Sequence, residues 1–240
     1  MVSKEIGSDV SVVVEPRIAV VGIGGAGCNI AAGFYSAMAP VDTIAINTDK
    51  DALDNQSADK KIYICKAVTE GEGTKGDARL GKRCAKVHED EIEKAVLGYD
   101  AVFIVAGMGG GTGTGAAAVV AEICGRNDIM TFTVAVNPFF FESTRITVAA
   151  DGLKAVRAVC PGTFVVENDK IFDLMPEATM EEAMRAVNGS IRDFISKIIA
   201  MIPDAVISET ESLMKNIREK IDRKDMPEVG DLQVSTGLKT

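Results

Sequence analysis

The residues best suited to chemistry form a stretch at 107–115 in which six of nine positions are glycine, in the order Gly-Met-Gly-Gly-Gly-Thr-Gly-Thr-Gly. A turn that serves only structure needs one or two glycines, and each further glycine costs backbone entropy on folding. Such an excess is expected where the main chain wraps closely around a ligand and offers its N–H groups to an anion. Thr112 and Thr114 add hydroxyl donors. The stretch therefore predicts a phosphate-binding loop.

A second glycine-rich turn lies at 22–27 and reads Gly-Ile-Gly-Gly-Ala-Gly, which fits the pattern G-x-G-x-x-G. The glycines of this pattern let the backbone approach a phosphate, and the helix that follows directs its N–H groups and positive dipole end at the anion. By itself the pattern also fits a tight strand-to-helix turn that binds nothing. Two helix starts aimed at one anion suit a di- or triphosphate better than a carboxylate.

Both turns follow short apolar runs that alternate with helical segments, an order typical of an α/β domain with a parallel sheet. The expected strands cover 17–23, 43–47, 61–65, 100–106, 130–136 and 163–166. The expected helices cover about 26–38, 78–96, 112–125 and 144–158, followed by a long central helix at about 178–202. Pro203 and Asp204 are expected to end that helix, because a proline interrupts the helical hydrogen bonds.

The pattern predicts a three-layer, Rossmann-like parallel sheet in residues 17–202, with the central helix included in this domain. We expect a flexible segment at 1–16, a short C-terminal helix at 203–225 and a mobile tail at 226–240.

Composition narrows the function classes. A net charge of -9 argues against non-specific binding of nucleic acid, because an acidic surface repels phosphates. The sequence contains no run of eighteen apolar residues and no signal-peptide pattern, so no transmembrane segment is expected. The five widely spaced cysteines form no C-x-x-C pair and indicate reduced thiols in a cytoplasmic protein. The single histidine, His88, lies in a charged stretch and is expected on a solvated helix face.

The string GMGGGTGTG at 107–115 resembles the signature of the tubulin/FtsZ superfamily of GTP-dependent cytoskeletal proteins. Further segments resemble the family's motifs in the expected order, and FtsZ is closer than eukaryotic tubulin. These are the N-T-D turn at 47–49, the loop near the γ-phosphate at 71–76, the ribose segment at 137–142 with Arg145, the N-D-K at 168–170, and Asn188 in the central helix. The resemblance covers roughly residues 17–202 and implies the family's GTPase-domain fold.

The resemblance implies a GTP or GDP site whose residues have distinct roles. Glycine amides and Thr112 would bind phosphates, Glu142 would accept from the ribose, and Asn168 and Asn188 would contact the guanine edge. Mg²⁺ would be held through water by Asp49 or Asp77. The implied nucleotide-binding set is Gly24, Gly25, Asn29, Asn47, Asp49, Gly73, Gly107, Gly109, Gly110, Gly111, Thr112, Gly113, Pro138, Glu142, Arg145, Asn168 and Asn188.

The chain departs from the family pattern in several places. Asn188 is followed by glycine rather than aspartate, and Arg145 lies one residue closer to Glu142 than usual. In the family, acidic residues after the central helix complete the neighbouring subunit's site, and here Glu209 and Glu211 are the candidates for this catalytic role in trans. They also fit an ordinary helix start. Only 36 residues follow Asp204, so we expect a divergent FtsZ-like protein without the family's second domain.

Three functions remain open. The favoured hypothesis is nucleotide-dependent self-association through the nucleotide face, with slow or assembly-dependent hydrolysis, in cell division or in membrane remodelling with a membrane-associated partner. The second is a fully active GTPase that uses Glu209 or Glu211 in trans. The third is an NAD(P)-dependent oxidoreductase, which fits G-x-G-x-x-G but gives no use to the loop at 107–115.

Overall fold

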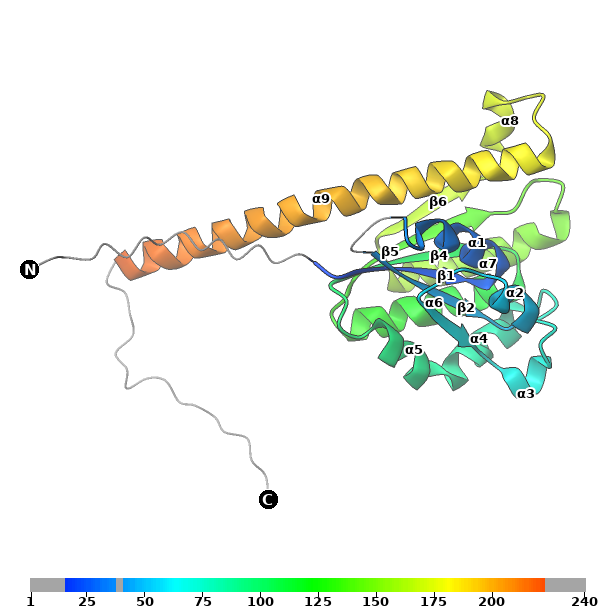
Figure 1. The fold of residues 1–240 in the computed structure, drawn as a ribbon, viewed down its shortest axis with the longest axis horizontal. Coiled ribbons are helices and arrows are strands. Elements are labelled where there is room, and N and C mark those ends of the chain that lie inside the picture. The colour runs from blue at the N-terminus through cyan, green and yellow to red at the C-terminus, as the bar shows by residue number, and fades with distance from the viewer. Residues whose placement is uncertain (1–15, 38–40, 223–240) are drawn as a thin grey trace, which may run out of the picture. The chain divides into compact units, whose positions relative to one another are not determined.

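The computed structural model describes residues 16–37 and 41–222, and side chains up to Ile202. In these residues six strands form one parallel sheet in the order β3-β2-β1-β4-β5-β6 (Figure 1). The strands are β1 (Ile18–Ile23), β2 (Val41–Asn47), β3 (Lys60–Tyr63), β4 (Ala101–Gly107), β5 (Met130–Asn137) and β6 (Thr163–Glu167). The expected parallel α/β fold is confirmed.

The strands form where the sequence has continuous apolar runs. All residues of β1 are buried, and β4 is buried from Ala101 to Ala106, so both faces of the sheet centre are covered. β1 pairs with both β2 and β4, and the chain proceeds outward from this centre in opposite directions. The turns after β1 and β4 therefore lie side by side at the switch point of the sheet, where parallel α/β folds bind their ligands.

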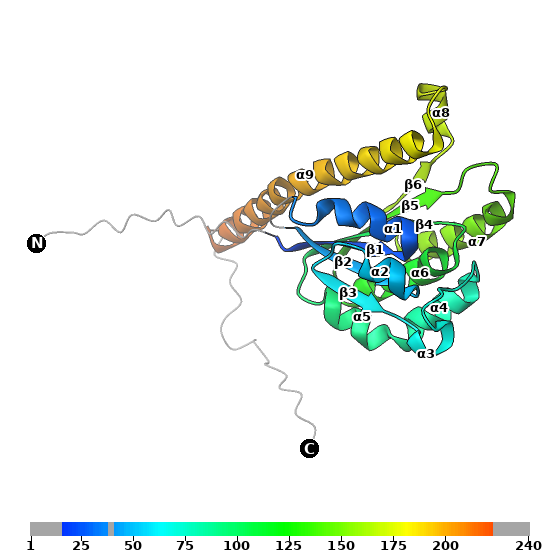
Figure 2. The ribbon, with the colours of Figure 1, turned by 45° about the vertical axis from the view of Figure 1, so that its right-hand side comes forward.

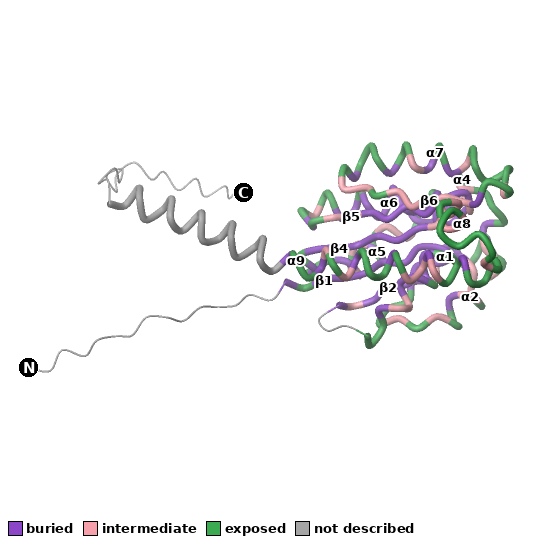
Figure 3. Tube along the Cα trace, turned by 90° about the horizontal axis from the view of Figure 1, so that it is seen from above, coloured by how far each residue is buried: buried purple, intermediate pink, exposed green. Residues whose placement is uncertain are grey.

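Helices cover both faces of the sheet, as Figure 2 shows. One face carries α1 (Gly24–Ala31), the 3-10 turn η1 (Ala32–Phe34), α2 (Lys50–Asp54) and the first part of α9 (Met180–Asp222). The other carries α4 (Ala78–Val87), α5 (Glu89–Val96), α6 (Gly111–Arg126) and α7 (Ser143–Val159). The short helices α3 (Lys66–Thr69) and α8 (Lys170–Leu174) follow β3 and β6. Figure 3 shows the centre of the sheet buried and α7 largely exposed.

The helix expected at 78–96 is divided at His88, and the expected solvated position of this histidine is wrong. His88 Nε2 accepts a hydrogen bond from the Cys65 N–H at 2.9 Å, and its Nδ1 lies 3.0 Å from a Glu91 carboxylate oxygen. The side chain is only 25% exposed. His88 therefore serves the junction of α4 and α5, a role that charge pattern alone does not indicate.

The structure also corrects the expectation that all five cysteines are reduced. Cys65, which follows β3, is joined by a disulfide to Cys84 in α4, with the two Cα atoms 5.0 Å apart. The two residues are 19 positions apart in sequence and form no recognisable motif. Only the tertiary fold brings them together. Cys28, Cys124 and Cys160 are buried free thiols.

The sequence predicted that the central helix ends at Pro203, but in the structure it continues past this residue. α9 runs from Met180 to Asp222 without interruption, although a proline inside a helix removes one backbone hydrogen bond. The chain divides into two compact units after Ile198, within α9, and the candidate site lies in the first unit. Among the helices within 16–37 and 41–222, none combines the length and the apolar character that crossing a membrane requires.

Candidate functional site

The two glycine-rich turns meet at the carboxyl edge of the sheet. A Cβ atom added at Gly24 would lie 2.9 Å from the backbone nitrogen of Gly113. One added at Gly107 would lie 2.7 Å from the Ala26 Cβ, and one at Gly27 would overlap the Val105 carbonyl oxygen. Glycine is required at these positions because the β1–α1 and β4–α6 turns approach each other at backbone distance.

Two other glycines in these turns are not explained by the protein's own packing. At Gly25 and Gly110, an added Cβ would have no described heavy atom within 4 Å, and neither residue has a positive φ. These positions face open space beside the first turns of α1 and α6. A glycine there keeps the backbone accessible to a ligand that approaches from outside.

The helices that begin at these turns leave their first amides without side-chain partners. α1 begins after Ile23 and α6 after Gly110, and no side chain in the described residues caps either helix. By contrast, Asp49 caps α2 and Asp77 caps α4. The uncapped N–H groups and the positive dipole ends of α1 and α6 together form a site suited to an anion.

Three threonine hydroxyls meet beside the second glycine turn. Thr112 Oγ1, in the first turn of α6, lies 2.6 Å from Thr48 Oγ1 and 3.3 Å from Thr74 Oγ1. All three residues are buried. Thr48 and Thr74 were not predicted as site residues, although they lie in two segments, 47–49 and 71–76, that the resemblance singled out.

A cavity of about 330 Å³ lies next to the β1–α1 turn, between α1, β5 and α9. It contains three of the four predicted asparagines, Asn29, Asn168 and Asn188, together with Gly25, whereas Asn47 does not line it. The Asn29 Oδ1 accepts from Gln56 at 2.7 Å, whereas the buried Oδ1 of Asn168 has no hydrogen-bond partner within the described residues. An unsatisfied buried amide oxygen that lines a cavity is suited to accept from a polar ligand.

The segment at 137–145 is engaged in contacts of its own. Glu142 Oε1 accepts from the Phe139 N–H at 3.0 Å, and Glu142 Oε2 forms an ion pair with Arg145 at 2.6 Å. Arg145 lies against the second glycine turn, since a Cβ at Gly109 would be 2.7 Å from the Arg145 Cβ. Pro138 lines a different cavity, also of about 330 Å³. The structure thus brings Arg145 to the turn and leaves Pro138 outside the cavity of the asparagines.

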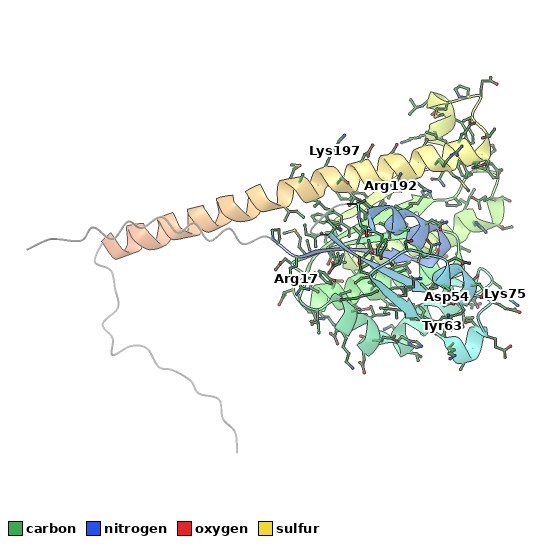
Figure 4. The ribbon with its side chains drawn as sticks, in the orientation of Figure 1. Arg17, Asp54, Tyr63, Lys75, Arg192 and Lys197 are labelled. Carbon is green, nitrogen blue, oxygen red and sulfur yellow. A yellow bond between two sulfur atoms is a disulfide. The ribbon has the colours of Figure 1, made fainter. Side chains whose placement is uncertain are left out.

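The turn at 47–49 and the loop at 70–77 pack on each other. Asn47 Oδ1 accepts from the N–H groups of Thr48 at 2.8 Å and Asp49 at 3.3 Å, so this side chain shapes the turn. A Cβ at Gly73 would lie 3.6 Å from the Asp49 Cβ. The Lys75 side chain points outward from the loop (Figure 4).

The predicted metal ligands are used within the protein through one oxygen each. Asp49 Oδ1 accepts from the N–H of Ala52, and Asp77 Oδ1 accepts from the N–H groups of Arg79 and Leu80. In the part of the chain that the structure describes, no three His, Cys, Asp or Glu residues gather as metal ligands. The predicted catalytic residues, Glu209 and Glu211, lie inside α9 rather than at a helix start, and their side chains lie outside the described residues.

The fold and the site define an α/β protein with two glycine-rich turns at the switch point of a parallel sheet. Residues 17–176 match the GTPase domain of the tubulin/FtsZ family, and the chain belongs to this family. This match leaves the oxidoreductase hypothesis without support.

Two relatives of this chain are cell division proteins. It is 38% identical over 189 residues to Cell division protein FtsZ 2 of Methanocaldococcus jannaschii and covers 50% of that protein. It is 36% identical over 185 residues to Cell division protein FtsZ 2 of Halobacterium salinarum and covers 47% of it. These alignments take in 78% and 77% of this chain. The chain thus spans about half the length of these relatives.

Two solved structures show the same fold. An FtsZ dimer of M. jannaschii in an empty state has a TM-score of 0.76 and 35% identity, over 79% of this chain and 56% of that one. A protofilament of CetZ2 from Haloferax volcanii with bound GTPγS has a TM-score of 0.70 and 26% identity, over 78% of this chain and 59% of that one.

Proposed function

We propose that this chain binds GTP and GDP at the carboxyl edge of its sheet. The observation that carries the proposal is the convergence of two uncapped helix starts, each beside a glycine that faces open space, Gly25 and Gly110. Phosphate groups would accept from the amides of these turns, and the helix dipoles favour their negative charge. The Thr112 hydroxyl would donate to the same phosphates.

The guanine base fits the cavity that holds the three asparagines. The unsatisfied Asn168 Oδ1 can accept from the N–H groups on the guanine edge, and the Asn188 amide can add a donor or an acceptor. Ribose hydroxyls would lie toward Glu142, which would have to share its carboxylate with Arg145. When bound, GTP supplies a phosphoanhydride bond whose cleavage releases the terminal phosphate.

The same proposal includes self-association through the nucleotide face, with hydrolysis that is slow or dependent on assembly. The FtsZ dimer and the CetZ2 protofilament support it as relatives that associate. Glu209 and Glu211 would act on a neighbouring subunit's nucleotide, and Mg²⁺ would bind the phosphates with Asp49 or Asp77 reached through water. A role in cell division or membrane remodelling, with a membrane-associated partner, follows as the cellular proposal.

Competition binding tests the nucleotide. A fluorescent GTP analogue should bind to the purified protein, and unlabelled GTP and GDP should displace it while ATP and NADH at the same concentrations should not. Replacing the orphaned amide, Asn168→Leu, should weaken GTP binding and reduce its preference over ATP, because the cavity loses the acceptor for the guanine edge. A protein that binds neither GTP nor GDP would contradict the proposal.

Turnover tests the assembly. GTP hydrolysis per molecule should rise with protein concentration if neighbouring subunits complete the site, and sedimentation of the same samples should show association. The double variant Glu209→Gln, Glu211→Gln should lose this turnover while retaining nucleotide binding. Unchanged turnover in that variant would dismiss the catalytic assignment of the two glutamates.

A further inference from the structure

The disulfide between Cys65 and Cys84 has an ionisable side chain beside it. His88, which follows α4, accepts a hydrogen bond through Nε2 from the Cys65 N–H at 2.9 Å, and its Nδ1 lies 3.0 Å from a Glu91 carboxylate oxygen. Since Nε2 accepts, it carries the lone pair of the ring, and Nδ1 carries the proton that Glu91 binds. An imidazole held between a cysteine and a carboxylate has the arrangement of a base that a third group orients.

Cys65 is held in a strained backbone conformation. Its φ of 64° and ψ of 33° lie in the left-handed region, which residues with a side chain rarely adopt. The conformation is fixed on both sides, because the Cys65 N–H is bound to His88 and the Cys65 carbonyl oxygen accepts from the N–H groups of Val68 and Thr69 at 3.0 and 3.1 Å. Strained residues that their neighbours hold in place cluster at reactive sites. The backbone therefore distinguishes Cys65 from Cys84, which lies in the regular helix α4.

The two cysteines of the disulfide also differ in their access to solvent. Cys65 keeps 8% of its surface exposed, whereas Cys84 is fully buried inside α4. A reagent from solvent therefore reaches Cys65 first, and Cys84 reacts only with a group that is already bonded to Cys65. A reversible thiol–disulfide centre requires this division, because exchange proceeds through a mixed disulfide at the accessible sulfur.

Opening the disulfide gives His88 a second role. The Cys65 thiol belongs to the residue whose N–H already reaches Nε2, so the thiol proton can pass to this nitrogen. The result is a thiolate beside an imidazolium, and the Glu91 carboxylate stabilises the positive ring. Of the other charged residues adjacent in sequence, Lys66 is exposed and favours the thiolate, and Glu89 is paired with an arginine of α6.

The other free thiols lack such surroundings. The buried sulfurs of Cys28 and Cys160 lie against main-chain carbonyl oxygens, which accept a hydrogen bond but do not take up the proton near neutral pH. Cys124 is buried as well. In the reduced chain, Cys65 is therefore the thiol best placed to react.

We propose that Cys65 is a redox-active cysteine that exchanges with low-molecular-weight disulfides, with Cys84 as its resolving partner and His88 as the residue that takes up its proton. In the reduced chain, the Cys65 thiolate attacks one sulfur of such a disulfide, whose S–S bond breaks. A mixed disulfide forms at Cys65, and the first thiolate leaves with the proton held by His88.

The second step closes the bond that the structure contains. The Cys84 sulfur attacks the Cys65 sulfur of the mixed disulfide, and the second thiolate leaves with the Cys84 proton. The chain thus loses two electrons and two protons, and the reagent is reduced to two thiols. This inference is independent of the proposed nucleotide binding, because no residue assigned to the nucleotide takes part.

Alkylation of the reduced, folded chain tests the reactive thiol. Iodoacetamide at pH 7 should modify one thiol rapidly, and mass spectrometry of the peptides should locate it at Cys65. Cys65→Ser should lose the rapid reaction, whereas Cys84→Ser and the control Cys160→Ser should retain it. Rapid modification at another cysteine, or at none, would overturn the proposal.

The proton-transfer role of His88 predicts a spectroscopic change that a structural role would not cause. His88→Asn should lower the ultraviolet absorbance of the thiolate and slow alkylation about tenfold, since asparagine can accept from the Cys65 N–H but takes up no proton. Glu91→Gln should act in the same direction. Glu89→Gln, the matched control on the same helix, should change neither value, because Glu89 pairs with Arg126 instead. Unchanged thiolate absorbance in His88→Asn would overturn the assignment of His88.

Glutathione disulfide tests the complete exchange. The reduced chain should regain the Cys65–Cys84 bond, whereas Cys84→Ser should stop at a mixed disulfide between glutathione and Cys65, which intact mass reveals. A Cys84→Ser chain that gains no glutathione would overturn the proposal and leave the nucleotide site untouched. Because Glu91→Gln keeps all five cysteines, its thiolate absorbance decides the matter even where a cysteine variant misfolds.

Discussion

Two groups of helices begin in different ways in this domain. α2 and α4 begin at Asp49 and Asp77, whose carboxylates accept from the first free amides. α1 and α6 begin at Ile23 and Gly110, and in the described part of the chain no side chain takes this role. A helix start without a cap leaves several donors unsatisfied. The helices α3, α5, α7 and α8 also begin without a side-chain cap, so a missing cap does not by itself mark a ligand site. The comparison teaches that α1 and α6 are distinguished by a second feature, the glycines Gly25 and Gly110 that face open space beside their uncapped starts.

The largest expected effect concerns α4, one of the two helices with a side-chain cap. The Cys65–Cys84 disulfide spans the segment that leads into this helix. Opening this bond should lower the free energy of unfolding by about 3 kcal/mol, because the unfolded chain regains the entropy of a loop closed over 19 positions. Urea denaturation with and without a reductant measures the difference. The variant Cys65→Ala, Cys84→Ala should not respond to the reductant. Five reactive thiols in the unreduced, denatured protein would contradict the disulfide.

The next effect concerns the uncapped start of α6. Gly110→Ala should weaken GTP binding tenfold or more, since an added methyl group keeps a phosphate from the amides of α6. Its effect on unfolding should be about 0.5 to 1 kcal/mol, because a Cβ there meets nothing and the loss is limited to the preference for glycine over alanine at the N-cap of α6. Calorimetry of binding and of unfolding gives the two values.

Two other glycines complete this test. Gly125→Ala, in the same helix and equally free of neighbours, should leave GTP affinity unchanged. Gly27→Ala should instead destabilise the fold by about 2 kcal/mol, because its Cβ would overlap the Val105 carbonyl oxygen. Equal GTP affinity in Gly110→Ala and Gly125→Ala would remove the distinction between the open turn and an ordinary exposed glycine.

A smaller effect is expected at the capped N-terminus of α4. Asp77→Ala should lower the free energy of unfolding by about 1 kcal/mol, as the amides of Arg79 and Leu80 lose their acceptor. Asp77→Asn should retain most of this stability, because asparagine caps nearly as well. Denaturation curves compare the variants, and GTP affinity measured with and without Mg²⁺ shows whether the lost charge matters. A Mg²⁺ response that vanishes in Asp77→Asn would assign this carboxylate to the metal as well.

The smallest effect comes from the start of α9, where Glu182 accepts from the N–H and hydroxyl of Thr179, both at 2.8 Å. These hydrogen bonds, the backbone one foremost, hold the Glu182 pKa below its ordinary value of 4.5. A lowered folded-state pKa means that the stabilisation is complete above pH 4.5 and is lost as the pH falls through the folded-state value. The stability difference between the unaltered chain and Glu182→Gln should therefore shrink from pH 7 to pH 3. A difference independent of pH would exclude this contribution.

The sequence predicted the fold well where a simple pattern determines it. Continuous apolar runs followed by glycine located β1, β4 and the turns after them, because buried parallel strands must be apolar and their close approach requires glycine. Helices of four or five residues, such as α3 and α8, are too short for any periodicity to reveal. Pro203 led to a wrong prediction of the helix end. Proline disfavours a helix interior, but α9 continues through Pro203 despite the loss of one backbone hydrogen bond.

The candidate site was predicted in its backbone elements more fully than in its side chains. The resemblance named three asparagines that share a cavity. It assigned Arg145 to the ribose segment, whereas the structure places Arg145 against the second glycine turn. It did not indicate that Glu142 would be paired with Arg145 or that Thr48 and Thr74 would meet at Thr112. Such contacts depend on loop conformation, which no residue spacing determines.

The burial of the free cysteines gives the folded chain low reactivity toward thiol-directed electrophiles. Burial raises the pKa of the Cys28 thiol to about 12 and that of Cys124 to about 12, and the Cys160 side chain is likewise buried. With Cys65 and Cys84 bonded to each other, no cysteine is left to supply a thiolate at the surface near neutral pH. A single cysteine introduced at the exposed Lys75 would therefore be a unique attachment point for a maleimide dye, with no prior removal of the natural thiols.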